Sequence, residues 1–139
     1  MSYAGDITPQ QAWDLLREHP DAVLVDCRTE AEWDAVGVPD VTELGKEPVF
    51  VEWNRVGGVR NHTFVDDVKA ALSARSAGSA PVVFLCRSGQ RSVGAAVAAT
   101  AAGLAPAYNV LDGFEGPVGP DGRRSVCGWK VLGLPWRQR

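Results

Sequence analysis

The sequence of 139 residues has little of what marks membrane, disulfide-stabilised or metal-binding proteins. Its apolar runs are too short to span a bilayer, and its first six residues lack the basic and apolar regions of a signal peptide, so we expect a cytoplasmic protein. The three cysteines are odd in number and lack metal-like spacing, which argues against a disulfide framework or a zinc site. His19 and His62 stand in no recognisable ligand pattern. We therefore expect no metal and no cofactor.

An excess of positive charge is missing as well. The net charge of −3 gives no general attraction to nucleic acid or to anionic membranes, so we expect neither as a partner. A hydrophobic content of 45% and a charged content of 22% are those of a soluble globular protein. There is no internal repeat, and the length fits a single domain over residues 1–139.

The most informative stretch runs from residue 82 to residue 102. Four apolar residues, 82–85, lead directly into Cys86, which is typical of a buried strand. Ser88 and Gly89 then break the apolar run, as a tight loop would. The following residues, 92–102, are rich in alanine and predict a helix. Cys86 is therefore expected where a strand ends, with a short loop leading to a helix N-terminus.

This position favours an ionised sulfur. Backbone N–H groups at a helix start are unpaired, and the helix dipole adds partial positive charge, so a thiolate is stabilised there. Arg87 and Arg91 add full charges, and they are the only charged residues between Pro81 and Leu111. The six residues from Cys86 to Arg91 thus predict a cysteine nucleophile that accepts an anion. The alternative is a buried cysteine that only packs.

A strand followed by Cys-Arg-Ser-Gly-Gln-Arg-Ser (residues 86–92) and an alanine-rich helix resembles the active-site loop of the single-domain rhodanese family of thiosulfate sulfurtransferases. Two further stretches, Leu-Val-Asp-Cys-Arg with Glu32-Trp33 and Asn-Val-Leu-Asp-Gly-Phe from Asn109, are similar to other parts of that family. Strands alternating with helices, together with this resemblance, predict an α/β fold: an open, mainly parallel five-stranded sheet with helices on both faces.

The resemblance implies that Cys86 carries a persulfide. Backbone N–H groups of the loop would hold its terminal sulfur, as an oxyanion hole holds an oxygen. Arg91 and Arg87 would orient an anionic donor such as thiosulfate, and cyanide or a thiol would take the sulfur. A protein persulfide is a further possible partner. The substrate-binding residues expected beside Cys86 are Arg87, Ser88, Gly89, Gln90, Arg91 and Ser92.

A second group of residues is expected to support this loop. Asp26 and Arg28, together with Glu32, would form a partly buried charge network beside the active strand, with a functional role as the alternative. Cys27 is expected to pack in the core, although it is also a candidate second thiol near the site.

Two other functions remain open at this point. A cysteine-dependent phosphatase resembles this architecture but has a loop one residue longer, which in family terms fits phosphate, whereas the shorter loop fits a persulfide. A binding module without catalysis would use the same cationic loop, but an intact Cys86 argues against it.

The rest of the chain alternates between the two kinds of element. Thr8-Pro9 with Gln11 predicts a capped helix start. Trp53, Asn54 and Arg55 are candidates for lining the site. Strands are expected near residues 6–7 and over 22–26, 49–53 and 108–111, helices after Thr8 and over 29–33 and 63–75, a turn at 76–79, and loops over 54–62 and 116–128.

Overall fold

The computed structural model describes residues 3–55, 57–74, 80–104, 106–124 and 126–139. Its centre is a sheet in the strand order β1-β8-β7-β2-β4, in which every neighbouring pair is parallel. The strands are β1 (Gly5–Ile7), β8 (Ala107–Val110), β7 (Val82–Leu85), β2 (Val23–Asp26) and β4 (Val49–Phe50). The predicted five-stranded parallel sheet is confirmed, and the turn expected at 76–79 lies outside the described residues.

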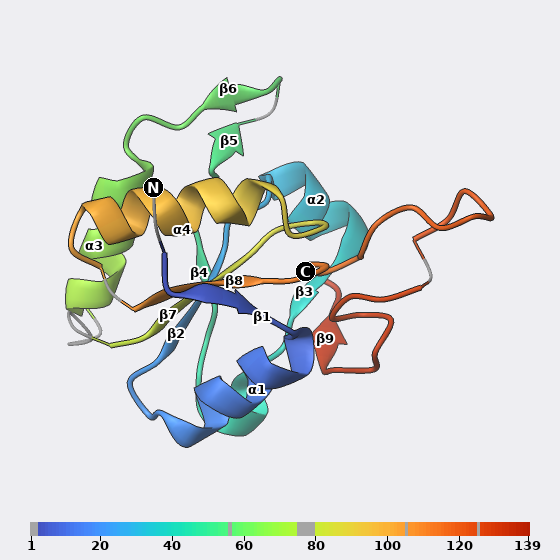
Figure 1. Cartoon of the computed structure of the whole chain (residues 1–139), viewed down its shortest axis with the longest axis horizontal. Coiled ribbons are helices and arrows are strands. Elements are labelled where there is room, and N and C mark those ends of the chain that lie inside the picture. The colour runs from blue at the N-terminus through green and yellow to red at the C-terminus, as the bar shows by residue number, and fades with distance from the viewer. Residues whose placement is uncertain (1–2, 56, 75–79, 105, 125) are drawn as a thin grey trace.

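Helices cover both faces of this sheet. In Figure 1, α3 (Phe64–Ala74) and α4 (Arg91–Ala101) lie above the strands, and α1 (Pro9–Glu18) lies below them. A shorter helix, α2 (Glu30–Val36), follows β2. Side chains alternate along the central strands, so that two apolar clusters form, one on each face. Both β2 and β7 are buried at every position, as strands covered on both faces must be.

The helix starts follow from local sequence. Thr8 accepts a hydrogen bond from the backbone N–H of Gln11, whose side chain bonds back to Thr8, which confirms the predicted capping box. Thr29 and Glu32 make the same arrangement at the start of α2. These caps place the first turn of each helix directly after the strand that precedes it.

Some predicted elements were wrong in extent. The strand expected over 49–53 ends at Phe50, and the loop expected over 54–62 contains a hairpin. Gly57 and Gly58 both have positive φ, and Gly58 N donates to the carbonyl of Arg55 at 3.0 Å, which closes the turn of that hairpin. Its strands are β5 (Asn54–Arg55) and β6 (Val59–Arg60).

The C-terminal segment returns to the body of the protein. Strand β9 (Trp136–Arg137) pairs antiparallel with β3 (Val38–Pro39), which precedes a 3₁₀ turn, η1 (Thr42–Leu44). Trp129 is fully buried on the α1 side, and its indole N–H donates to the carbonyl of Pro135 at 2.7 Å. The pairing of β9 was not predicted, because two residues at a chain end carry no periodic signal.

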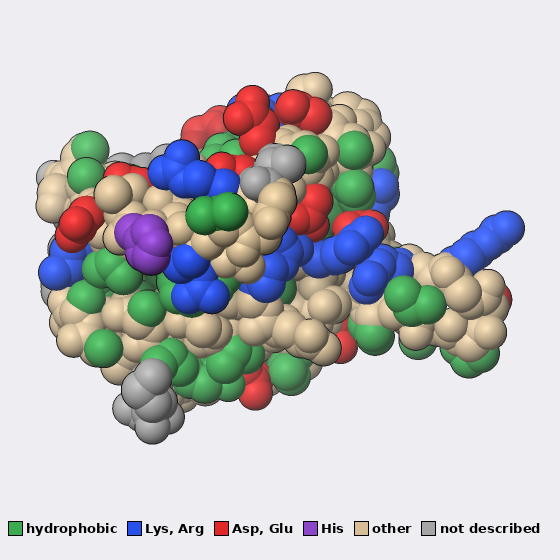
Figure 2. Space-filling view, turned by 90° about the horizontal axis from the view of Figure 1, so that it is seen from above, with side chains coloured by type: hydrophobic (Ala, Val, Ile, Leu, Met, Phe, Trp, Pro, Cys, Tyr) green, Lys and Arg blue, Asp and Glu red, His purple; other side chains and the backbone are tan. Residues whose placement is uncertain are grey.

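The segment over 116–124 projects from the body at the right of Figure 1, and the same lobe projects in the view from above in Figure 2. Lys and Arg side chains lie across the face shown in Figure 2 and reach that lobe. Within the described residues, no helix combines the length and the apolar character needed to cross a membrane.

Candidate active site

Cys86 lies at the carboxyl end of the central strand β7, and the segment 86–91, here called the Cys86 loop, leads from it to α4. The residue is 1% exposed. Parallel strands with helical crossovers gather their carboxyl ends at one edge, where such folds bind ligands. The predicted arrangement of strand, loop and helix around this cysteine is confirmed.

Three donors surround the sulfur of Cys86. The backbone N–H of Gly89 lies 3.2 Å from Sγ, and that of Ser92 lies 3.4 Å away. The Ser92 hydroxyl lies at 3.1 Å. The two N–H groups present their hydrogens to this atom, and the hydroxyl is placed to do the same, so negative charge on the sulfur is stabilised. Gly89 has φ +90°, a conformation that glycine adopts without strain, and this turn aims its N–H inward.

A buried asparagine completes this set, and no sequence pattern indicated its role. Asn109, in β8, accepts a short hydrogen bond from the Ser92 hydroxyl. Its amide group donates to Asp6 at 2.9 Å and to the Gly89 carbonyl at 3.2 Å. The bond from Asn109, and then that from Tyr3, lowers the pKa of Asp6. A hydroxyl has one proton, so Ser92 donates either to Asn109 or to Cys86 at a given moment.

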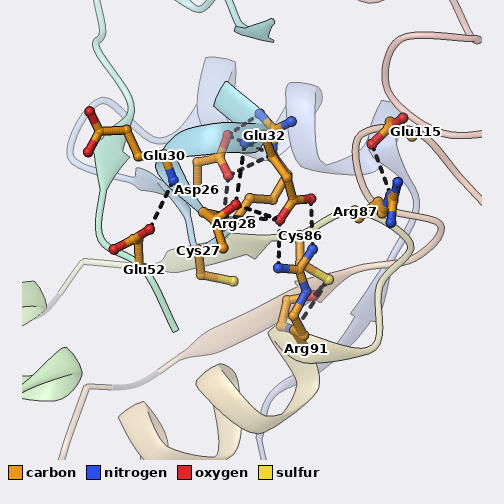
Figure 3. A network of polar contacts seen from close by, with 12 residues as sticks. Asp26, Cys27, Arg28, Glu30, Glu32, Glu52, Cys86, Arg87, Arg91 and Glu115 are labelled. Carbon is orange, nitrogen blue, oxygen red and sulfur yellow. Dashed lines mark hydrogen bonds and ion pairs between the residues drawn. The ribbon is translucent and has the colours of Figure 1, made fainter. Parts of the chain in front are cut away.

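The two arginines of the loop are paired with carboxylates from distant parts of the chain. Arg91 makes two bonds to Glu32 of α2, at 2.8 and 2.9 Å. Arg87 bonds to Glu115 at 3.2 Å and is largely exposed. Figure 3 shows both pairs beside Cys86. These pairs fix the loop at both ends, while the orientation of a donor by either arginine stays a prediction.

The contact between Arg91 and Glu32 changes the pKa of both side chains. Burial acts to raise the pKa of Glu32, but the hydrogen bond and charge of Arg91, with bonds from Thr29, outweigh it and hold the pKa below its usual 4.5. The hydrogen bond to Glu32 raises the pKa of Arg91. A carboxylate with a lowered pKa stabilises the fold above its unfolded pKa, and this contribution is lost as pH falls through the folded pKa.

We therefore expect the Glu32→Gln protein to lose stability less steeply than the wild type as pH falls below about 4.5. At neutral pH it should be less stable by about 1–2 kcal/mol, because the ion pair is lost while glutamine keeps the capping box. Urea unfolding at a series of pH values measures both effects. Parallel pH profiles for the two proteins would contradict the assigned role of Glu32.

Asp26 and Arg28 form a separate, fully buried pair. Both side chains are without exposure, and Arg28 Nη2 lies 2.6 Å from Asp26 Oδ2. Arg28 also donates to the Gly37 carbonyl at 2.9 Å and lies over the ring of Phe114 at 4.3 Å. Within the described residues, its Nη1 makes no hydrogen bond. The pair ties the end of β2 to the end of α2 and to the segment after β8, so it supports the Cys86 loop without touching the sulfur.

That segment holds the Cys86 loop through Gly113. The backbone N–H of Phe114 donates to the Cys86 carbonyl at 2.8 Å, and that of Glu115 donates to the Arg87 carbonyl at 2.9 Å. Gly113 has φ +59°, and a Cβ there would lie 2.3 Å from the Cys86 carbonyl oxygen. The chain can approach the Cys86 loop this closely only with glycine at this position.

The Gly113→Ala protein should lose about 2–4 kcal/mol of stability, because alanine combines backbone strain with an overlap. Gly103→Ala is the matched control. Gly103 has φ +88° but open space around it, so this change should cost about 1 kcal/mol. Denaturant unfolding measures both, and equal losses for the two proteins would contradict the close approach at Gly113.

A pocket of about 660 Å³ adjoins the Cys86 loop. Of the three candidates for lining the site, Trp53 and Asn54 line this pocket, whereas Arg55 is absent from its lining and donates to Asn61 at 3.1 Å. Arg60 lies over the ring of Trp53 at 3.8 Å and was missed, because the hairpin that carries it was not predicted. The lining residues are Trp53, Asn54, Arg60, Gln90, Arg91, Gly94, Val97, Ala98 and Ala101.

The remaining loop residues take different positions. Gln90 is exposed and faces this pocket, and Ser88 is half-buried at the tip of the loop. Cys27 is fully buried in the core cluster on the α4 side, and Cys127 is partly buried. No group of three or more potential metal ligands occurs in the part of the chain that the structure describes.

Comparison with known proteins shows the family of the chain. A family model described as the STR4 middle domain matches residues 4–139. The chain belongs to the STR4 middle domain family. The chain is 36% identical over 132 residues to an uncharacterised protein of Rickettsia conorii, covering 95% of this chain and 96% of that protein.

Three solved structures are similar to the chain in fold. The crystal structure of Rv0390 from M. tuberculosis is 56% identical, with 99% of this chain and 100% of that chain covered and a TM-score of 0.90. A rhodanese-like domain protein from Staphylococcus aureus is 20% identical, with 78% and 86% covered and a TM-score of 0.52. A polysulfide-sulfur transferase homodimer from Wolinella succinogenes is 25% identical, with 96% and 78% covered and a TM-score of 0.59. The fold is rhodanese-like.

Proposed function

We propose that this protein is a sulfurtransferase in which Cys86 carries the sulfur. The observation that carries the proposal is the set of donors around Sγ: the N–H groups of Gly89 and Ser92 and the Ser92 hydroxyl. Such donors stabilise a thiolate, and they also stabilise negative charge on the terminal sulfur of a persulfide, which is bonded to Sγ. The likeness to a polysulfide-sulfur transferase supports the same chemistry.

The reaction has two steps. The thiolate of Cys86 attacks the sulfane sulfur of thiosulfate or of an organic persulfide. The sulfur–sulfur bond of the donor breaks, and sulfite or a thiolate leaves with the electron pair. Cyanide or a thiol then attacks the terminal sulfur of the persulfide, and Cys86 leaves as the thiolate. Each step is a displacement at sulfur, so no metal or redox cofactor takes part.

Donor and acceptor reach the sulfur from the side of the pocket. Gln90 and Arg91 belong both to the Cys86 loop and to the pocket lining, so a molecule bound there lies beside the loop. The charge of Arg91 is balanced by Glu32, but Arg60, which lies over the Trp53 ring, adds positive charge to the pocket and favours anionic donors such as thiosulfate. Trp53 and the residues of α4 make most of the pocket lining apolar, so the pocket has room for the body of an organic thiol or persulfide.

The proposal is tested by sulfur transfer in solution. Wild-type protein is given thiosulfate or an organic persulfide together with cyanide, and thiocyanate is measured. We expect catalytic formation of thiocyanate with at least one donor and no hydrolysis of an aryl phosphate, because a loop of this length fits a persulfide in the family that it resembles. Absence of thiocyanate with every donor, or turnover of the aryl phosphate, would contradict the proposal.

A further inference from the structure

Cys27 and Cys86 are neighbours at the ends of adjacent strands. In the parallel pairing of β2 with β7, Asp26 lies opposite Leu85, and each cysteine is the residue directly after its strand. The backbone N–H of Cys27 donates to the Leu85 carbonyl at 2.9 Å and closes this last pair of the ladder, so the two cysteines directly follow a paired position. Neighbouring strands lie about 4.8 Å apart. This is within the range of about 4.4–6.8 Å between Cα atoms that a disulfide requires.

The two side chains also point to the same face of the sheet. Every second residue belongs to the core cluster on the α3 and α4 side: Val23, Val25 and Cys27 along one strand, and Val82, Phe84 and Cys86 along the other. Figure 3 shows the sulfur atoms of Cys27 and Cys86 in yellow, with Arg91 next to Cys86. The thiol of Cys27 donates to the Leu85 carbonyl at 3.3 Å and is fully buried. No part of the proposed transfer reaction uses this thiol.

The surroundings keep Cys27 as a neutral thiol. Burial raises its pKa, and the nearby charges of Cys86 and Asp26 raise it further. Cys27 therefore does not compete with Cys86 for an incoming donor. Cys86 has N–H donors around it, whereas Cys27 keeps a proton that it can give up in a later step.

We infer that Cys27 resolves the Cys86 persulfide and releases hydrogen sulfide, an inference that rests on the proposed function. The terminal sulfur of the persulfide takes the proton of Cys27, and the Cys27 thiolate then attacks Sγ of Cys86, so that a Cys27–Cys86 disulfide forms. The bond from Cys86 to the terminal sulfur breaks, and that sulfur leaves with the electron pair as hydrosulfide. The sulfane sulfur is reduced, and the two cysteines are oxidised. Two molecules of a low-molecular-weight thiol then reduce the disulfide and are themselves oxidised to their disulfide.

This reaction gives the protein a second outcome when an acceptor is scarce. With cyanide or an acceptor thiol present, the terminal sulfur is transferred. Without one, it leaves as sulfide and the site closes as a disulfide. The burial of both cysteines protects the disulfide from large reductants, because Cys86 is only 1% exposed and Cys27 is not exposed.

The test follows the fate of the persulfide sulfur after a single treatment with a donor. Wild-type, Cys27→Ser, Cys27→Val and Cys127→Ala proteins are treated with thiosulfate or an organic persulfide, freed of the donor, and followed by intact mass and by a sulfide assay. The wild type and Cys127→Ala should lose the added sulfur, release one equivalent of sulfide and end two hydrogens lighter than the reduced protein. Both Cys27 variants should lose the sulfur at least about tenfold more slowly.

The possible failures are distinct. A persulfide that persists in the wild type, or that decays equally fast in the Cys27 variants, overturns the inference and leaves the proposed function standing. Absence of a persulfide in every protein overturns the proposed function and the inference together. The two replacements at position 27 differ in polarity and size, and their circular dichroism spectra show whether each is folded before the load.

Discussion

The Cys86→Ala and Cys86→Ser proteins should form thiocyanate no faster than donor and cyanide alone. Alanine has no nucleophile, and the serine oxygen is a far weaker one that cannot hold a persulfide. Because Cys86 is buried and nearly isosteric with serine, the second variant should keep the wild-type fold. Steady-state thiocyanate formation measures the loss, and the far-UV spectrum with the unfolding midpoint shows that the fold is kept.

Cys127→Ala is the matched control for this experiment, since that cysteine is partly buried and is not among the groups around Cys86. Its rate should equal that of the wild type. Residual activity in both Cys86 variants, or an equal loss in Cys127→Ala, would show that the sulfur is carried elsewhere.

The Arg28→Leu protein should lose about 3–5 kcal/mol of stability, which is close to the whole stability of many domains of this size. Removing the guanidinium leaves the Asp26 carboxylate buried without a counter-charge, and the bond to the Gly37 carbonyl is lost as well. Urea unfolding at neutral pH measures the effect. If the loss approaches the whole stability of the fold, the variant should be partly unfolded even without urea.

Two control variants distinguish the effect of an unpaired buried charge from the effect of losing an arginine side chain. Arg17 pairs with Asp14 on the surface, where the two side chains are 57% and 36% exposed, so Arg17→Leu should change stability by about 0.5 kcal/mol or less. The double change Asp26→Leu with Arg28→Leu should be more stable than Arg28→Leu alone, because no buried charge remains unpaired. If the double variant is no better than the single one, packing around Arg28, and not the charge of Asp26, explains the loss.

The elements around the site were predictable because their signals are local. The apolar run before Cys86, the break at Ser88 and Gly89 and the alanine-rich segment after them each depend on a few adjacent residues. The same holds for the capped start of α1 at Thr8. The parallel sheet followed from the alternation of strands and helices, and the resemblance to rhodaneses agreed with it.

What escaped prediction depends on register between distant segments. Between Pro81 and Leu111 the loop arginines have no acidic neighbours in the sequence, yet the fold brings Glu32 and Glu115 to them from 59 and 28 residues away. Asn109 reaches the Ser92 hydroxyl because β8 lies beside β7. The neighbourhood of the two strand-end cysteines likewise depends on the pairing of β2 with β7. None of these contacts has a pattern within one element.

The central claim is that the sulfur of Cys86, held by the N–H groups of Gly89 and Ser92, accepts one further sulfur. It is tested most directly by the mass of the wild-type protein within seconds of mixing with thiosulfate or an organic persulfide, followed by mapping of the adduct to a peptide. We predict a gain of one sulfur atom, located on the peptide that contains Cys86. No gain with any donor, or a sulfur located on Cys27 or Cys127 instead, would contradict the account.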